Sequence, residues 1–220
     1  MSKMIEHGAT VLFQGDSITD AGRSREHDAD LGRGYAAMVA AWFSALYPER
    51  GVRFINRGIS GDRVRDLRAR WQPDCLDLHP TWVSFLIGIN DTWRRYDSND
   101  PTPVEAYEED FRTILQLTRD SLNAQLIIME PFLLPIPPDR AAWRDDLNPK
   151  IRVARQLAVD FGAVFVPLDG AFAIAATKRE MAFWLPDGVH PTPAGHALIA
   201  QAWLRAVEGH TTGHQDPKHP

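Results

Sequence analysis

The sequence predicts an α/β domain in which helices cover both faces of a parallel sheet. Five short runs are rich in apolar residues, and segments with helical spacing alternate with them along the chain. Nearly continuous apolar runs are typical of buried parallel strands, and their alternation with helices is typical of a parallel sheet. The predicted strands are Thr10–Gln14, Val52–Asn56, Trp82–Ile87, Gln125–Glu130 and Ala163–Leu168.

The predicted helices carry their apolar side chains on one face. Between Tyr35 and Tyr47, for example, Val39 and Phe43 recur at helical spacing. Pro149 would kink or break one of the helices, and Thr192 is suited to cap the last one. The predicted helices are Tyr35–Tyr47, Pro103–Asp120, Arg140–Phe161 and Thr192–Val207.

Composition argues against several classes of protein. The chain has 220 residues and a net charge of −5, and it contains no run of Lys and Arg of the kind that binds nucleic acid. The basic residues between Arg63 and Arg70 alternate with apolar ones and indicate the solvated face of a helix. The single cysteine, Cys75, cannot form an internal disulfide and is expected to be an inert, partly buried thiol.

The domain organisation follows from the same pattern. One α/β pattern runs through residues 1–208 without a second boundary, so these residues are predicted to form a single domain. Residues 209–220 are polar and are expected to be a disordered tail. No apolar segment has the length of a signal peptide or a membrane span, which predicts a cytoplasmic protein without a membrane partner. The sequence leaves a homo-oligomer open.

Residues with catalytic potential follow the first two predicted strands. Ser17 comes directly after the first strand, and Gly15 permits a sharp exit from that strand. There the serine hydroxyl can point into the crevice where open α/β sheets bind ligands, although Ser17 could instead only cap a helix. After the second strand, Gly58 and Gly61 either expose backbone N–H groups of the kind an oxyanion hole requires or form a plain turn.

One further candidate group follows the third strand, and another lies late in the chain. The side-chain amide of Asn90 can donate to a developing oxyanion or form an Asx turn. Asp187 and His190 share one short turn, where the aspartate can orient the histidine as a general base. They could also be a metal pair, but no further ligand lies nearby in the sequence. Because such groups follow successive strands of one parallel sheet, nucleophilic catalysis is favoured over chance.

Four sequence blocks resemble those of the SGNH hydrolases, also called GDSL esterases and lipases. The resemblance implies a three-layer α/β/α sandwich of the flavodoxin-like type, with about five parallel strands. It also implies Ser17 as the nucleophile, His190 as its base and Asp187 as the residue that orients the base. The oxyanion donors would be the N–H groups of Ser17 and Gly61 and the side chain of Asn90. The blocks are Gly15-Asp16-Ser17, Gly61, Gly88-Ile89-Asn90-Asp91 and Asp187-Gly188-Val189-His190.

The segments Gly15 to Asp20, Gly58 to Gly61 and Gly88 to Arg94 are similar to those of the intracellular acetylxylan esterases of this superfamily. The similarity implies a serine esterase that removes acetyl groups from acetylated xylan or xylo-oligosaccharides, without a metal or other cofactor. Sugar rings stack on aromatic faces, which Trp93, Tyr96, Trp143 and Trp184 could offer, although core packing would also explain these side chains. The residues assigned to substrate binding are Asp16, Trp93, Arg94 and Trp184.

Three other functions stay open at this point. The first is a lysophospholipase or thioesterase of the same superfamily, which would favour long acyl chains. The second is a carbohydrate-binding module that has the fold without turnover. The third is a glycosidase that uses Asp16 or Glu130, which would leave the serine, asparagine and histidine placements unexplained.

Overall fold

The computed structural model describes residues 5–212 and contains one sheet of five parallel strands in the order β2-β1-β3-β4-β5. β1 lies between β2 and β3, so the chain winds outward in both directions from the boundary between β1 and β3. Open α/β sheets bind ligands at the carboxyl ends of the strands beside such a boundary. The strands are β1 (Thr10–Gly15), β2 (Arg53–Asn56), β3 (Trp82–Leu86), β4 (Gln125–Met129) and β5 (Val164–Val166).

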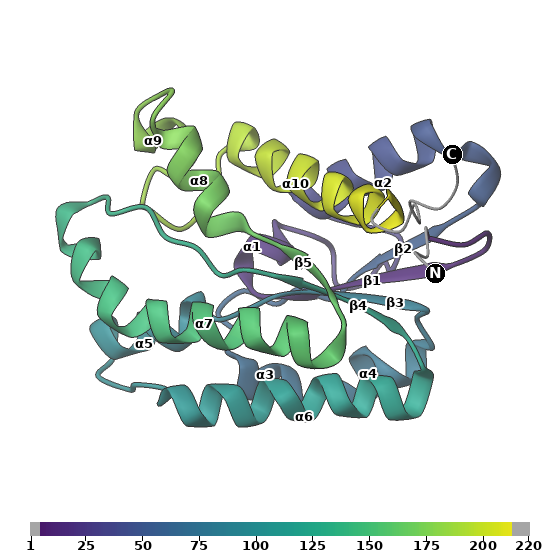
Figure 1. Ribbon diagram of the computed structural model, residues 1–220, viewed down its shortest axis with the longest axis horizontal. Helices are drawn as coiled ribbons and strands as arrows, with labels where there is room; N and C mark the ends of the chain where they lie inside the picture. The colour runs from purple at the N-terminus through teal and green to yellow at the C-terminus, as the bar shows by residue number, and fades with distance from the viewer. Residues whose placement is uncertain (1–4, 213–220) are drawn as a thin grey trace, which may run out of the picture.

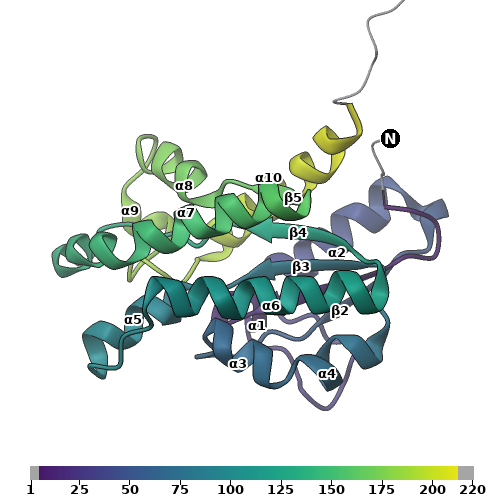
Figure 2. The same ribbon diagram turned by 60° about the horizontal axis from the view of Figure 1, so that its bottom comes forward.

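Helices cover both faces of the sheet, as predicted. One face carries α2 (Tyr35–Leu46), α8 (Leu168–Ala176) and α10 (Pro193–Thr212), which lie above the sheet in Figure 1. The opposite face carries α3 (Val64–Ala69), α6 (Val104–Leu122) and α7 (Arg144–Phe161), and Figure 2 brings α3 and α6 to the front. Each face has its own buried apolar cluster against the sheet. The predicted three-layer sandwich is therefore confirmed.

Shorter helices occupy the connections. α1 follows β1 and α5 follows β3, and α5 and α9 both lie on the left side of the molecule in Figure 1. They are α1 (Ser17–Asp20), α4 (Trp71–Asp74), α5 (Ile89–Asp97), α9 (Met181–Trp184) and the 3₁₀ turns η1 (Pro48–Arg50), η2 (Leu76–Leu78) and η3 (Pro138–Trp143).

The structure corrects some predicted boundaries. β5 ends at Val166, because Pro167 has no N–H for the strand ladder and α8 begins directly after it. The helix predicted over Arg140–Phe161 is divided into η3 and α7, and Pro149 lies inside α7 without ending it. Thr192 caps α10 as predicted, accepting a hydrogen bond from the N–H of Gly195 at 3.2 Å.

The last helix is longer than predicted. α10 continues to Thr212, so the first four residues of the expected tail are helical. Gly209 does not end the helix, because a single glycine weakens a helix by only about 1 kcal/mol. Residues 213–220 of that tail lie outside the described residues. No helix within residues 5–212 is both long and apolar enough to cross a membrane.

Two side chains are more buried than predicted. Arg63 is only 6% exposed and pairs with Asp100, so it does not belong to the solvated face of α3. Cys75 is completely buried in the apolar layer against α6, and burial raises the pKa of its thiol to about 12. A thiol that stays protonated is a poor nucleophile, which agrees with the expected inert role.

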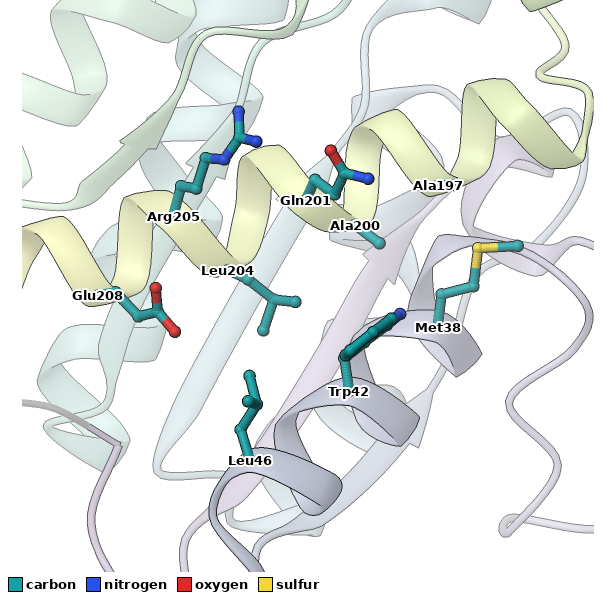
Figure 3. Close-up of a pocket in the computed structure, with 9 residues that line it drawn as sticks. All are labelled: Met38, Trp42, Leu46, Ala197, Ala200, Gln201, Leu204, Arg205 and Glu208. Carbon is teal, nitrogen blue, oxygen red and sulfur yellow. The ribbon is translucent and has the colours of Figure 1, made fainter.

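An apolar groove separates α2 from α10. Leu46 projects from α2 toward Leu204 of α10 and Trp42 projects toward Ala200, and these side chains line a cavity of about 280 Å³ (Figure 3). Trp42 is 61% exposed and Leu46 51% exposed. Exposed apolar patches of this kind often mark contact surfaces. The groove shares no lining residue with the sites that follow β1 and β3.

Candidate active site

Ser17 opens helix α1 directly behind the end of β1. A Cβ on Gly15 would lie 2.3 Å from the carbonyl oxygen of Leu86 and 2.3 Å from Thr19 Oγ1, so only glycine permits this exit from the strand. Asp16 is the N-cap of α1, because its Oδ1 accepts a hydrogen bond from the N–H of Ile18 at 3.0 Å. The capping role considered for Ser17 therefore belongs to Asp16, and the Ser17 hydroxyl is free for another partner.

That partner is His190, which the fold brings to Ser17 across 173 positions of sequence. Ser17 Oγ lies 3.0 Å from His190 Nε2, and His190 Nδ1 lies 2.7 Å from Asp187 Oδ2. The arrangement suits the tautomer in which Nδ1–H donates to the carboxylate and Nε2 accepts from the hydroxyl. The three side chains thus form one continuous hydrogen-bonded chain.

The turn that carries Asp187 and His190 is held by its own backbone. Asp187 Oδ1 accepts from the N–H of Val189 at 3.0 Å and from the N–H of His190 at 2.7 Å. Gly188 has φ +81° and packs so closely that an added Cβ would lie 2.4 Å from the carbonyl oxygens of Leu134 and Ile136. The segment from Leu134 therefore supports the turn, and the N–H of Leu134 donates to the carbonyl of Gly188 at 2.9 Å.

The electrostatics of the pair suit a general base. Burial would raise the pKa of Asp187, but hydrogen bonds from the His190 side chain and from two turn amides outweigh it and hold the pKa below its usual range. The hydrogen bond to Asp187 raises the pKa of His190 above its ordinary value of 6.5, against the effect of burial. His190 is thus a stronger base than a free imidazole, beside a carboxylate that stays ionised.

Potential oxyanion donors lie in and next to the loop that follows β2, whose Ile59 N–H donates to the carbonyl of Gly15 at the end of β1 at 3.0 Å. The side chain of Asn90 donates one hydrogen through Nδ2 to the carbonyl of Asp62 at 3.0 Å, which ties its amide to the loop that contains Gly61. The loop is anchored to α1, because the N–H and Oγ of Ser60 each lie 3.1 Å from Asp20 Oδ2. Among residues 5–212, no acceptor binds the N–H of Ser17 or of Gly61. Both amides and the second Asn90 hydrogen are thus available to a ligand.

The residues assigned to substrate binding have different surroundings. The rings of Trp93 and His190 lie 5.7 Å apart, and Arg94 Nη2 would lie 3.7 Å from a Cβ on Gly61, so the structure brings both residues to the site. Asp16 is only 1% exposed beneath Ser17, and burial raises its pKa to about 7. Trp184 contacts Phe183 and lines a different cavity of about 550 Å³ between α8, α9 and α10.

One residue at the rim carries no functional signal in the sequence. Arg140 is only the first residue of a predicted helix there, but in the structure its Cζ lies 4.5 Å from the ring centroid of Trp93 and 3.7 Å from that of Trp143. Tyr96 stacks on the same Trp143 ring at 5.1 Å, so Trp93, Tyr96 and Trp143 form a cluster beside His190 that does not include Trp184. No local pattern signals this cluster, because η3 and α5 meet only in the folded chain. Within the described residues, no three His, Cys, Asp or Glu side chains come together as metal ligands.

Comparison with known proteins identifies the family. Residues 13–198 match the model of the GDSL-like lipase/acylhydrolase family. The chain belongs to this family. It is therefore a carboxylic ester hydrolase, as the resemblance of its sequence blocks implied. This GDSL-like hydrolase is 38% identical over 211 residues to the acetylxylan esterase of Geobacillus stearothermophilus, covering 92% of this chain and 95% of the relative.

Solved structures of related proteins have the same fold as this GDSL-like hydrolase. Axe2, an acetylxylan esterase from Geobacillus stearothermophilus, superposes with a TM-score of 0.84 at 38% identity, covering 93% of this chain and 96% of Axe2. LAE5, an α/β hydrolase from the metagenome of Lake Arreo, superposes with a TM-score of 0.86 at 34% identity, covering 94% and 98%. Axe2 variants with alanine in place of a serine, an aspartate or a histidine are described as catalytic mutants.

Proposed function

We propose that the protein is a serine esterase that removes acetyl groups from acetylated xylan or xylo-oligosaccharides. The observation that carries the proposal is the hydrogen-bonded chain from Ser17 through His190 to Asp187 at the carboxyl ends of the strands. The similarity to an acetylxylan esterase over most of both chains supports an acetylated sugar as the substrate. The aspartate and histidine of the Axe2 catalytic mutants also have the same spacing as Asp187 and His190.

In the proposed acylation step, Ser17 Oγ attacks the carbonyl carbon of the acetyl ester while His190 Nε2 takes the hydroxyl proton. The carbonyl oxygen becomes an oxyanion, which accepts hydrogen bonds from the N–H groups of Ser17 and Gly61 and from Asn90. The tetrahedral intermediate collapses when the bond to the sugar oxygen breaks. His190 then returns its proton to that oxygen, and acetyl-Ser17 remains.

Deacylation repeats the chemistry with water. His190 takes a proton from a water molecule as the water oxygen attacks the acetyl carbonyl, and the same donors stabilise the second oxyanion. Acetate leaves when the bond to Ser17 Oγ breaks, and His190 returns the proton to the serine. Asp187 holds the imidazole in the required tautomer and stabilises its protonated form throughout. No metal or organic cofactor enters this scheme.

A substrate panel tests the proposed function. Acetylated xylo-oligosaccharides, p-nitrophenyl esters from acetate to palmitate, and acyl-CoA distinguish the acetyl esterase from the lysophospholipase or thioesterase that the sequence left open. A carbohydrate-binding module would bind the oligosaccharides without releasing acetate. Release of acetate from the oligosaccharides, dependent on Ser17, is the expected result. Cell fractionation tests the cytoplasmic location, which stays a prediction, and light scattering tests whether the protein forms the homo-oligomer that the sequence leaves open.

The rate should fall steeply as the acyl chain lengthens. Trp93 and Arg94 flank His190 and Gly61, so bulky side chains limit the space for the acyl group. An open apolar pocket would gain about 0.8 kcal/mol for each added methylene, whereas a steric wall would lose more than that. The measurement is kcat/KM for acetate, butyrate, octanoate and palmitate esters. Octanoate hydrolysis as fast as acetate hydrolysis would contradict the acetyl specificity.

Activity should rise with pH through the ionisation of His190. Protonated His190 cannot accept the serine proton, so kcat/KM is low at acidic pH and increases as the pH passes the raised pKa of this imidazole, above 6.5. Asp16 has a pKa of about 7 and its negative charge raises that of His190. The profile should therefore move to lower pH in the Asp16→Asn variant. A profile that is flat between pH about 5 and 9, with chemistry rate-limiting, would argue against His190 as the base.

Replacing Asn90 with alanine should lower kcat by about 10²- to 10³-fold with little change in KM. The amide acts on charge that develops only in the transition state, so its loss affects turnover more than ground-state binding. Asn148→Ala, on the exposed surface of α7, is the matched control and should have wild-type kinetics. A variant changed mainly in KM would instead mean that Asn90 binds the ester before reaction.

A further inference from the structure

One guanidinium at the rim of the active site contacts aromatic rings but has no hydrogen-bond acceptor. Among the described residues, no carboxylate, carbonyl or hydroxyl binds the Arg140 side chain, and its Nε is buried without a hydrogen bond. Most other arginines of the described chain form ion pairs with Asp or Glu. The positive charge of Arg140 is therefore left uncompensated in a protein whose net charge is −5. Such an arrangement favours an anionic ligand.

Arg140 is fixed close to the reacting groups. Its guanidinium lies over the ring of Trp93, and that ring is the neighbour of His190 at 5.7 Å. The hydroxyl of Tyr96 donates to the carbonyl of Ala142 at 2.9 Å, which ties η3 to α5. A sugar whose ester carbonyl reaches Ser17 would thus have its neighbouring substituents near Arg140.

Ring contact and burial determine which atoms of Arg140 are available. Its Cζ lies close to the rings of both Trp143 and Trp93, and because these rings are inclined at 64°, the planar guanidinium can lie flat on only one of them. Its Nε is buried, so the two terminal NH₂ groups, which point outward in the plane of the guanidinium, are the donors left for a ligand. Two parallel N–H groups match the two oxygens of a carboxylate, and the stacking has already ordered the side chain. A sugar hydroxyl could accept one such hydrogen bond but would leave the charge uncompensated.

We propose that Arg140 forms a carboxylate subsite, and that the enzyme prefers acetylated sugars that carry a carboxylate near the ester, as a uronic acid branch does. This inference rests on the proposed acetyl-esterase function and defines its substrate class more closely. Trp93 and Trp143 hold the guanidinium in place, and Arg140 determines specificity rather than taking part in bond cleavage.

The test compares two substrates that differ only at one carboxyl group. One is an acetylated xylo-oligosaccharide with a single uronic acid branch, and the other is the same compound with the carboxyl converted to an amide. In the wild-type enzyme, kcat/KM should be at least about tenfold higher for the acid than for the amide, because a charge-assisted hydrogen bond contributes a difference of this size. The ratio should fall to about one in Arg140→Gln, and it should decrease with added salt. Arg152→Gln removes an exposed charge from α7 and should keep the wild-type ratio.

Binding of the same two compounds to the Ser17→Ala variant separates this inference from the proposed function. Absence of acetate release from both compounds in the wild-type enzyme would refute the acetyl-esterase function, whereas the Kd values still report the subsite. Tighter binding of the acid, lost in Ser17→Ala/Arg140→Gln, is the expected result. Equal Kd values for acid and amide, or a preference for the acid that survives Arg140→Gln, would overturn the carboxylate subsite.

Discussion

The Ser17→Ala variant is expected to lose kcat on acetyl esters by a factor on the order of 10⁶ while it remains folded. The hydroxyl is the only group that forms the covalent intermediate in the proposed mechanism, and no other serine hydroxyl contacts His190 among residues 5–212. The side chain contributes little to the fold, because Asp16 rather than Ser17 caps α1. The measurements are kcat on p-nitrophenyl acetate and the Tm of both proteins.

Ser121→Ala provides the matched control for this variant. Ser121 is exposed near the end of α6, far along the chain from the site, and its replacement should leave both kcat and Tm unchanged. A folded Ser17→Ala protein that retains a tenth of the wild-type kcat would remove Ser17 from the mechanism.

Asp187→Asn should lower kcat by about 10⁴-fold without changing the position of the turn. The asparagine amide can donate to His190 Nδ1, so the imidazole would take the tautomer whose Nε2 carries a hydrogen and cannot accept the serine proton. The variant also loses the charge that raises the pKa of His190, so the remaining activity should begin to rise at lower pH. Asp145→Asn, exposed in the first turn of α7, is the control for a lost surface carboxylate.

Stopped-flow measurement of the acetylation step distinguishes this role from a structural one. A slower acetylation step with an unchanged Tm is expected for Asp187→Asn. If the folded fraction of the variant became acetylated on Ser17 at the wild-type rate, and activity was lost only because part of the protein unfolded, Asp187 would be a structural residue of the turn.

The strands and the long helices were predictable because their burial pattern is local. A strand such as β3, buried on both faces, has an apolar run that is visible in the sequence, and α6 shows one apolar stripe over its full length. Most of the short helices were not predicted, since a single turn such as α9 has too few residues for a period to appear. The end of β5 was also misplaced, because the apolar run continues past Pro167 into α8, which begins at the next residue.

The candidate site was predictable to the extent that its residues follow strand ends. Parallel strands place their carboxyl ends on one edge, so Ser17 and Asn90 were expected to be neighbours. The contact between Ser17 and His190 depended on the resemblance to a known family as well, because it joins the two ends of the domain. Arg140 and the placement of Trp184 depend on packing between distant segments, for which the sequence contains no local signal.

The most direct test of the mechanism is to trap the covalent intermediate. A fluorophosphonate reacts with an activated serine, and mass spectrometry of the intact protein followed by peptide mapping locates the adduct. One adduct per chain on Ser17, absent from Ser17→Ala and formed more slowly by Asp187→Asn, is the predicted result. A stoichiometric adduct on any other residue, or an acetyl-enzyme that still accumulates in Ser17→Ala during turnover of p-nitrophenyl acetate, would contradict the assignment of Ser17 as the nucleophile.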